Sequence, residues 1–422
     1  MVSNPKVSAA NLWGNEVINM KYPLRYIVFL LLVSSLRADD VPQFRGPGGL
    51  GISKETNLPT KWNGTEGVRW KADLAGRGLS NPVIAGGRVY VTATAAYQQK
   101  REVVLCFDVK TGKKLWERQV WATGATQSHE KTNMAAPTPI ADGERVYALF
   151  ATGDLVCYDK DGDLVWYRSL VGDYPTVGNN VGMAASPTIS GDRLLICMEN
   201  VGESFAVAID KYTGKNIWRV ERPRGINWVS PVVIDNAGHA EVLFQGPTGI
   251  DAHDVASGKK NWSAPKLRHT AYATLTVGDG VVFVPSDKFT ALRPAKANAE
   301  PEVLWQSLKL RPAYCSPIAH QGLIYVVGGG GVVHCADAKT GEILWSHRIE
   351  PAGAYAASPL LADGKLYITS EKGITAVLQA GKEAKVLATN PIGATILASP
   401  IAADGALFLR SDGALYCIGK SK

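Results

Sequence analysis

The chain has 422 residues, of which 46% are apolar, and its 45 basic and 38 acidic side chains give a net charge of +7. This apolar content allows a large buried core, either in several small domains or in one closed toroid. The mild basic excess contains no Lys/Arg block and no basic patch interleaved with aromatic residues, so no nucleic-acid partner is expected.

The first segment, residues 1–38, is predicted to be an extension followed by a signal peptide. From Met20 the sequence reads MKYPLRYIVFLLLVSSLRA, with basic residues first, then a short apolar run, then small residues ending at Ala38. Met20 is therefore a better start than Met1. Retention of the apolar run as an anchor is the alternative, but the run is too short to span a bilayer. No cysteine follows it, so a bacterial lipoprotein anchor has no acceptor.

A mature chain without residues 1–38 has a net charge of +4, because that segment holds four basic residues and one acidic residue. We expect it to be periplasmic or otherwise extracytoplasmic, to have no transmembrane anchor after cleavage, and to be a monomer. Residues 39–67 form a predicted N-terminal leader, and residues 68–422 form the main domain.

The main domain is built from internal repeats with a period of about 41–55 residues, a spacing typical of propeller blades. Each repeat opens on a small or polar residue followed by proline, at Asn81, Ala136, Ser186, Ser230, Ser316, Ser358 and Ser399, with a degenerate copy lacking proline near Thr274. A Gly-x-x-Tyr/Phe landmark follows, ending at Tyr90, Tyr147, Phe283, Tyr325, Tyr367 and Phe408.

The third landmark is Asp-x-x-Thr/Ser-Gly followed by Trp, and it indicates a turn into the last strand of each repeat. Asp side chains bond the backbone ahead of them, and Gly accepts positive φ at no steric cost. The pattern occurs from Asp108 to Trp116, Asp210 to Trp218, Asp254 to Trp262 and Asp337 to Trp345. Repeat two has a variant ending at Trp166, repeat five keeps only Trp305, and repeat seven has Val386 or Leu387 instead of Trp.

These short alternating runs, bounded by Gly, Asp and Pro, predict β-strands joined by tight hairpins, four strands in each repeat. The eighth repeat stops at Ile418, before its tryptophan strand. Residues 68–72 (VRWKA) match the tryptophan strand at residues 114–118 (KLWER) and precede the first complete repeat. We therefore predict an all-β protein, an eight-bladed β-propeller of four-stranded antiparallel blades, closed by an N-terminal strand.

Six cysteines in an exported chain would suggest disulfides. However, Cys106, Cys157, Cys335 and Cys417 occupy equivalent third-strand positions in four different repeats, generally beyond the reach of a disulfide. Cys197 in a second strand and Cys315 beside a repeat start have no obvious partner. We expect the four equivalent cysteines to be small buried residues and most of the six thiols to be free.

The recurring landmarks resemble those of the quinoprotein-like (PQQ-repeat) β-propeller superfamily, whose signature Ala-x-Asp-x-x-Thr-Gly-x-x-x-Trp is matched at residues 336–345. The resemblance covers about residues 68–418. The leader PQFRGPGGLGIS at residues 42–53 is similar to that of an exported bacterial branch common in planctomycetes. This likeness implies one of two functions: a pyrroloquinoline quinone (PQQ)-dependent oxidoreductase with calcium, or a non-catalytic scaffold like the propeller subunit of the outer-membrane β-barrel assembly machine.

The oxidoreductase is the disfavoured alternative. The dehydrogenases of the superfamily need an Asp base, a Glu/Asn calcium cage and, in many members, adjacent cysteines, and this chain has no Cys-Cys pair and no haem-attachment motif. Carboxylates are also few in the segments that lead into each repeat. We therefore expect no cofactor, no metal site and no catalytic residue.

The lead-in segments converge on one mouth of the central channel, and their polar and aromatic side chains suit recognition of a ligand or peptide. A solvated rim without a ligand is the alternative. The candidate site residues are Arg77, His129, Lys131, Asn133, Asn180, Trp228, His269, Tyr272, Arg311, Tyr314 and Tyr355. The sequence thus predicts an exported, scaffold-like propeller that binds envelope proteins, or a saccharide or peptide ligand; a carbohydrate-binding propeller is a further alternative.

Overall fold

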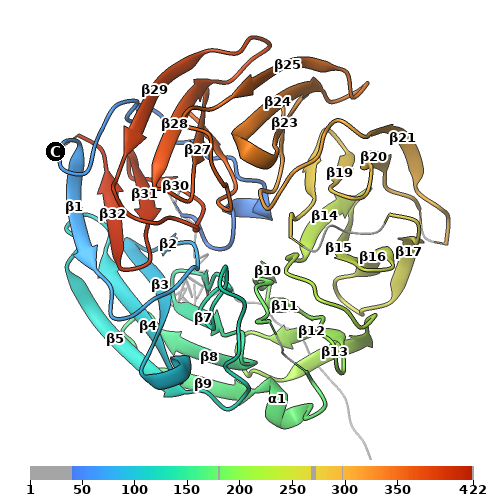
Figure 1. The fold of residues 1–422 in the computed structure, drawn as a ribbon. Coiled ribbons are helices and arrows are strands. Elements are labelled where there is room, and N and C mark those ends of the chain that lie inside the picture. Colours follow the sequence, from blue (N-terminus) through green and yellow to red (C-terminus); the bar gives the residue numbers. More distant parts are fainter. Residues whose placement is uncertain (1–39, 179–180, 268–271, 297, 421–422) are drawn as a thin grey trace, which may run out of the picture. The chain divides into compact units, whose positions relative to one another are not determined.

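The computed structural model describes residues 40–178, 181–267, 272–296 and 298–420. They belong to the compact unit Leu36–Lys422, in which eight four-stranded antiparallel sheets stand around a central opening (Figure 1). The predicted eight-bladed β-propeller is confirmed. The predicted signal peptide lies outside the described residues. Within the described ranges, no helix is both long enough and apolar enough to cross a membrane.

Each of the first four blades is a meander that runs from an inner to an outer strand. Blade 1 comprises β2 (Val83–Ala85), β3 (Arg88–Ala95), β4 (Arg101–Asp108) and β5 (Lys114–Trp121). Blade 2 comprises β6 (Ile140–Ala141), β7 (Arg145–Leu149), β8 (Asp154–Asp159) and β9 (Leu164–Ser169). Blade 3 comprises β10 (Thr188–Ser190), β11 (Arg193–Met198), β12 (Phe205–Asp210) and β13 (Asn216–Glu221). Blade 4 comprises β14 (Val232–Asn236), β15 (His239–Gly246), β16 (Gly249–Asp254) and β17 (Lys260–Ala264).

The other four blades repeat this order, except that the last takes its outer strand from the start of the domain. Blade 5 comprises β18 (Thr276–Gly278), β19 (Val281–Val284), β20 (Phe289–Arg293) and β21 (Glu302–Ser307). Blade 6 comprises β22 (Ile318–His320), β23 (Leu323–Val327), β24 (Val332–Asp337) and β25 (Ile343–Arg348). Blade 7 comprises β26 (Leu360–Ala362), β27 (Lys365–Thr369), β28 (Ile374–Gln379) and β29 (Val386–Pro391). Blade 8 comprises β30 (Ile401–Ala403), β31 (Ala406–Arg410), β32 (Ala414–Ile418) and β1 (Val68–Asp73).

The ring closes through β1, as the sequence predicted. β1 pairs antiparallel with β32, with Trp70 opposite Cys417 and Ala72 opposite Leu415, so the two ends of the domain lie side by side (Figure 1). The pairing gives blade 8 its fourth strand, so β32 has no unpaired hydrogen-bonding edge. Helices are minor among the described residues: α1 (Leu170–Asp173), and the 3-10 turns η1 (Pro47–Gly49), η2 (Tyr97–Gln99) and η3 (Gly329–Gly331).

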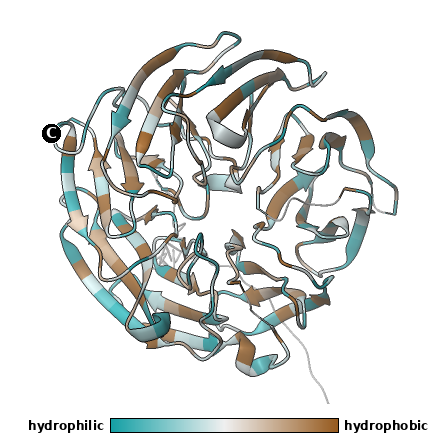
Figure 2. Ribbon diagram, viewed as in Figure 1, coloured by the Kyte–Doolittle hydropathy of each residue, from teal (hydrophilic) through white to brown (hydrophobic). Residues whose placement is uncertain are grey.

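The hydrophobic core consists of eight clusters, one at each contact between neighbouring blades. The Gly-x-x-Tyr/Phe residues all lie in these clusters and are at most 2% exposed, and burying one such aromatic side chain contributes roughly 1.5–3 kcal/mol. Hydrophobic residues accordingly run along the middle strands, whereas the hairpins and loops are mostly hydrophilic (Figure 2). All six cysteines are buried and none forms a disulfide; five lie in strands, and Cys315 lies just before β22 (Ile318–His320).

Each Asp-x-x-Thr/Ser-Gly turn places its glycine against the tryptophan of the preceding blade. In blade 6, Asp337 Oδ1 accepts hydrogen bonds from the backbone N–H groups of Thr340 and Lys339 at 2.9 Å, and the bond from Thr340 helps to lower the pKa of Asp337. Gly341 follows at φ +76° and lies against the indole of Trp305. That indole donates its N–H to the Ala338 carbonyl at 3.0 Å. The landmark tryptophans therefore pack between blades.

A closed circle of hydrogen bonds surrounds the channel. One residue in each blade, at the end of the lead-in, accepts the backbone N–H of the equivalent residue in the preceding blade through its side-chain oxygen, at 2.9–3.2 Å. We call these eight residues the hydroxyl ring: Asn81, Thr138, Ser186, Ser230, Thr274, Ser316, Ser358 and Ser399. In blade 2 this equivalence corrects the predicted repeat start, because Thr138 and not Ala136 occupies the ring position.

The leader crosses the channel on the side opposite the lead-in loops. Val41 forms a bridge with Ile84 of blade 1, and the Gly51 carbonyl accepts the N–H of Leu361 in blade 7 at 2.8 Å. Between them, the guanidinium of Arg45 donates to the carbonyl of Pro317 in blade 6 at 2.5 Å. Phe44 lines the bottom of the channel. Residues 41–51 of the leader thus form the floor of the propeller (Figure 1).

Candidate binding site at the channel mouth

Two layers of side chains line the channel, whose cavity of about 130 Å³ ends at Phe44. The lower layer is the hydroxyl ring. The upper layer consists of the residues two positions before each ring residue: Leu79, Ala136, Ala184, Trp228, Tyr272, Tyr314, Ala356 and Leu397. Aromatic residues occupy this layer only in the three consecutive blades 4, 5 and 6. One wall of the mouth is therefore aromatic, and the facing wall carries alanine and leucine.

The aromatic wall extends into a continuous arc with His129 from the lead-in of blade 2. The ring centroids of His129 and Trp228 are 6.2 Å apart, those of Trp228 and Tyr272 are 5.4 Å apart, and those of Tyr272 and Tyr314 are 4.7 Å apart. We call these four residues the aromatic arc. A second cavity of about 130 Å³ lies against it, lined also by Lys131, Val181 and Ile226. The structure thus brings together five of the predicted site residues, namely Lys131 and the four members of the arc.

Lys131 joins the arc to the opposite side of the mouth. Its ammonium group lies 5.2 Å from the centroid of the Tyr314 ring, a cation–π contact, and it forms a 2.8 Å ion pair with Glu371 in the hairpin between β27 and β28 of blade 7. The hydrogen bond to Glu371 raises the pKa of Lys131, so the lysine is charged at neutral pH. Sequence analysis did not identify Glu371, because its hairpin has no repeated landmark.

Arg77 and Asn133 support the mouth from the side of blades 8 and 1. Arg77 forms a 3.1 Å ion pair with Asp412 and donates to the Glu130 carbonyl at 3.4 Å. Asn133 is fully buried and donates to the Arg77 carbonyl at 3.1 Å. Both residues hold the loop that carries His129 and Lys131, and Asn133 presents no surface to a ligand.

Two other predicted residues do not reach the mouth. Tyr355 is 3% exposed and packs in the core between blades 6 and 7 against Gly331, where burial raises its pKa to about 12. Tyr355 lies three positions before its ring residue Ser358, whereas the arc residues lie two positions before theirs, so it faces the blade interior. Arg311 is exposed but folds back onto the Leu308 carbonyl at 2.9 Å. Asn180 and His269 lie outside the described residues.

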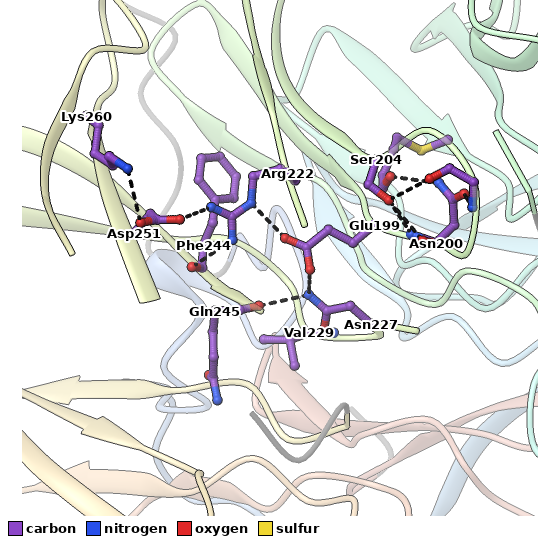
Figure 3. Close-up of polar contacts among 12 residues, drawn as sticks. Glu199, Asn200, Ser204, Arg222, Asn227, Val229, Phe244, Gln245, Asp251 and Lys260 are labelled. Carbon is purple, nitrogen blue, oxygen red and sulfur yellow. Dashed lines mark hydrogen bonds and ion pairs between the residues drawn. The ribbon is translucent and has the colours of Figure 1, made fainter. Parts of the chain in front are cut away.

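A buried polar network holds the loop that presents Trp228 (Figure 3). Glu199 and Arg222, whose side chains are 0% and 1% exposed, pair at 2.7 Å. The other carboxylate oxygen of Glu199 accepts from Asn227 at 2.7 Å, and Asn227 Oδ1 accepts the N–H of Val229 at 2.9 Å. These bonds fix the backbone on both sides of Trp228, whose indole N–H donates to the Gly182 carbonyl at 2.8 Å. Sequence analysis placed Asn227 in the lead-in but did not identify this network.

A second buried acidic cluster lies between blades 1 and 2. Thr152 Oγ1 is 2.5 Å from a carboxyl oxygen of Glu102 and 2.8 Å from one of Asp154. The Thr152 hydroxyl proton can be donated to only one of the two carboxyl groups. The other hydrogen bond therefore needs a second proton, which Glu102 supplies if it is protonated. Burial and the nearby Asp154 raise the pKa of Glu102 to about 9, which agrees with a neutral Glu102. The other Asp154 oxygen accepts from the Tyr167 hydroxyl at 2.5 Å, so the cluster joins the two blades.

The arrangement at the mouth is suited to binding. Aromatic rings, two ion pairs and the hydroxyl groups of Tyr272 and Tyr314 surround the cavity. The two mouth carboxylates described above, Glu371 and Asp412, are engaged by Lys131 and Arg77. Over the described part of the chain, no three His, Cys, Asp or Glu side chains are grouped so that they could hold a metal ion.

Comparison with known proteins places this fold among bacterial propellers. The family described as outer membrane protein assembly factor BamB matches residues 52–227, 118–289 and 295–387. The outer membrane protein assembly factor BamB of Burkholderia pseudomallei (strain K96243) is 23% identical over 341 residues, which are 72% of this chain and 85% of that protein.

Two solved structures share the fold. BamB from Moraxella catarrhalis superposes with a TM-score of 0.61 at 16% identity, over 83% of this chain and 96% of that one. The quinohemoprotein alcohol dehydrogenase from Comamonas testosteroni superposes with a TM-score of 0.67 at 13% identity, over 92% of this chain and 82% of that one. At these identities the structures establish the fold alone. The family match covers most of the sequence, and the chain therefore belongs to the PQQ-repeat β-propeller family of outer membrane protein assembly factor BamB.

Proposed function

We propose that this protein is an exported, non-catalytic scaffold that binds proteins of the bacterial envelope, and that the mouth bearing the aromatic arc is its binding surface. The relatives named assembly factors support the protein-binding class. The single observation that carries the choice of surface is the arc itself. Tyr272 is 40% exposed and His129 is exposed, and aromatic side chains dominate the binding energy of protein interfaces.

The opposite face offers a different chemistry. The leader covers the channel there, and the surrounding turns are of the Asp-x-x-Thr-Gly type, whose polar atoms bond within the turn, as at Asp108 and Asp210. Such turns stabilise the blades and leave few side-chain groups for a partner. The mouth also contains a pre-organised element, because the buried network fixes the Trp228 loop, and a rigid anchor loses less conformational entropy on binding.

We propose further that the protein works without a quinone. The described residues that line the channel cavity include no carboxylate that could hold calcium, the oxygens of the hydroxyl ring accept backbone N–H groups, and the cavity of about 130 Å³ ends at Phe44. The residues present do not fit that cofactor. A titration of the purified chain with pyrroloquinoline quinone and calcium tests this proposal. One quinone bound per chain, with turnover of alcohols or sugars, would replace the scaffold by an oxidoreductase.

A photo-cross-linking amino acid at Ile226, which is 43% exposed and lines the mouth cavity, tests the binding surface in cells. We expect light-dependent adducts with envelope proteins, identifiable by mass spectrometry, and their loss when Trp228 and Tyr314 are changed to alanine. The matched control places the same amino acid at Lys339, which is exposed in a turn on the opposite face. Adducts from Lys339 and none from Ile226 would move the binding surface to the leader side.

A further inference from the structure

The shape of the aromatic arc limits what can bind to it. The planes of neighbouring rings are inclined by 56° between His129 and Trp228, by 59° between Trp228 and Tyr272, and by 55° between Tyr272 and Tyr314. Rings inclined in this way form a row of wedge-shaped notches and not a flat platform. A notch of this kind suits a compact, puckered ring.

Three polar groups of the arc are available to a ligand, whereas the indole N–H of Trp228 is already bonded to the Gly182 carbonyl. The hydroxyl groups of Tyr272 and Tyr314 make no hydrogen bond to any described residue, and His129 accepts the Lys131 N–H through Nδ1 at 3.1 Å, which leaves the proton of the neutral ring on Nε2. These groups can donate to carbonyl oxygens. The charges at this edge of the mouth, on Lys131 and Glu371, neutralise each other, so the wall suits an uncharged segment.

From this geometry, and resting on the proposed protein-binding function, we infer that the arc binds a proline-rich segment of a partner protein in the polyproline II conformation. Such a segment keeps its carbonyl groups free to accept hydrogen bonds and loses little conformational entropy on binding, and aromatic-lined grooves are its usual receptors. Two residues of this helix advance about 6.2 Å, close to the ring-to-ring distances of 5.4 and 6.2 Å around Trp228. Pyrrolidine rings two residues apart can therefore occupy neighbouring notches.

The buried network behind Trp228 adds to this specificity. Because Asn227 and Gly182 fix the loop and the indole, the notches on both sides of Trp228 keep a constant width. Ala184 and Ala356, which flank the aromatic wall in blades 3 and 7, and Ala136 across the channel are small and leave room for the peptide to lie against the arc. The ligand contacts one wall of the mouth and does not plug the channel.

Calorimetric titration of the full chain with decaproline tests the inference, with a Gly-Ser decapeptide and chitohexaose as the other ligands. We expect decaproline to bind and the Gly-Ser peptide not to bind. Trp228→Ala and Tyr272→Ala should each weaken decaproline binding by about tenfold or more, and Tyr272→Phe, which keeps the ring and removes the hydroxyl, should weaken it less. Trp121→Ala is the matched control, because Trp121 is 61% exposed on an outer strand.

Three outcomes would overturn the inference. They are no decaproline binding at millimolar concentration, decaproline binding that Trp228→Ala does not change, and chitohexaose binding that Trp228→Ala abolishes while decaproline fails to bind. The last outcome would assign the arc to saccharides. If decaproline does not bind but light-dependent adducts still form from Ile226, the inference is wrong and the proposed scaffold function is still supported. The two proposals can therefore be tested separately.

Discussion

Removal of one acceptor from the hydroxyl ring should destabilise the propeller by an amount that the structure allows us to work out. Thr274 Oγ1 accepts the backbone N–H of Ser230 at 3.2 Å, and both residues are at most 5% exposed. Thr274→Val keeps the shape of the side chain and removes this acceptor. A buried N–H without a partner costs about 1–3 kcal/mol, so we expect the free energy of unfolding to fall by about that amount.

Thr276 provides a control two residues further along the chain, at the start of β18. Thr276 is 0% exposed, and its hydroxyl has no hydrogen-bond partner among the described residues. Thr276→Val makes the same chemical change, but it removes a buried hydroxyl that is already unsatisfied. This variant should therefore be neutral or more stable than the wild type.

Urea unfolding of the wild type and both variants gives the two free-energy differences directly, provided that the dependence of the unfolding free energy on urea concentration has the same slope in all three proteins. The expected result is a lower midpoint for Thr274→Val and an unchanged or higher midpoint for Thr276→Val. Equal shifts of the same sign would refute the reasoning, because they would mean that the circular hydrogen bonds contribute nothing beyond the packing of the side chain.

Three further predictions concern the blades. Gly341→Ala should destabilise the protein by about 1–3 kcal/mol more than Gly322→Ala in the same blade. Both glycines have φ above +70°, but only at Gly341 would the new Cβ lie 2.6 Å from an indole. Equal losses of stability in urea unfolding would exclude the contact with Trp305. The second prediction concerns Glu102→Gln. Because the pKa of Glu102 is raised to about 9, the folded wild type holds a proton that the unfolded chain releases above about pH 4.3. The stability of the wild type should therefore fall relative to that of the variant by at most about 1.4 kcal/mol per pH unit between pH 5 and 9, and parallel pH profiles would contradict this. All six thiols should react with a thiol reagent only in denaturant, as burial and the raised pKa of about 12 at Cys315 predict, and rapid reaction of the folded protein would disprove it.

The fold could be predicted from the sequence because each blade uses the same local interactions. Asp337 accepts backbone N–H groups within its own turn, and Gly341 adopts a positive φ beneath a tryptophan. These roles depend on residues a few positions apart, so they recur as a readable period. The closing strand was predictable for the same reason, since Trp70 occupies the position of Trp116 in a displaced copy of the repeat.

The site was only partly predictable, because its decisive contacts join distant residues. Lys131 and Glu371 are 240 positions apart, and no pattern in either segment indicates the other. The leader makes its contacts mainly through backbone groups, such as the hydrogen bond from the Leu361 N–H to the Gly51 carbonyl. Residue types in the sequence do not indicate such backbone contacts. Tyr314 and Tyr355 differ only by one position relative to their ring residues, yet one lies in the arc and the other in the core.

That one-position difference also indicates where binding can arise in a repeated fold. The ring residues are alike in all eight blades, apart from Asn81, because each must accept the N–H of its neighbour, and a change at any of them breaks the circle. The residues two positions earlier have no such structural requirement, and they vary between blades, for example Leu79, Trp228 and Ala356. An eightfold scaffold therefore leaves its upper channel layer free to vary blade by blade. Three adjacent aromatic residues in that layer make the mouth one-sided, and a one-sided wall is what an extended chain needs in order to bind along it.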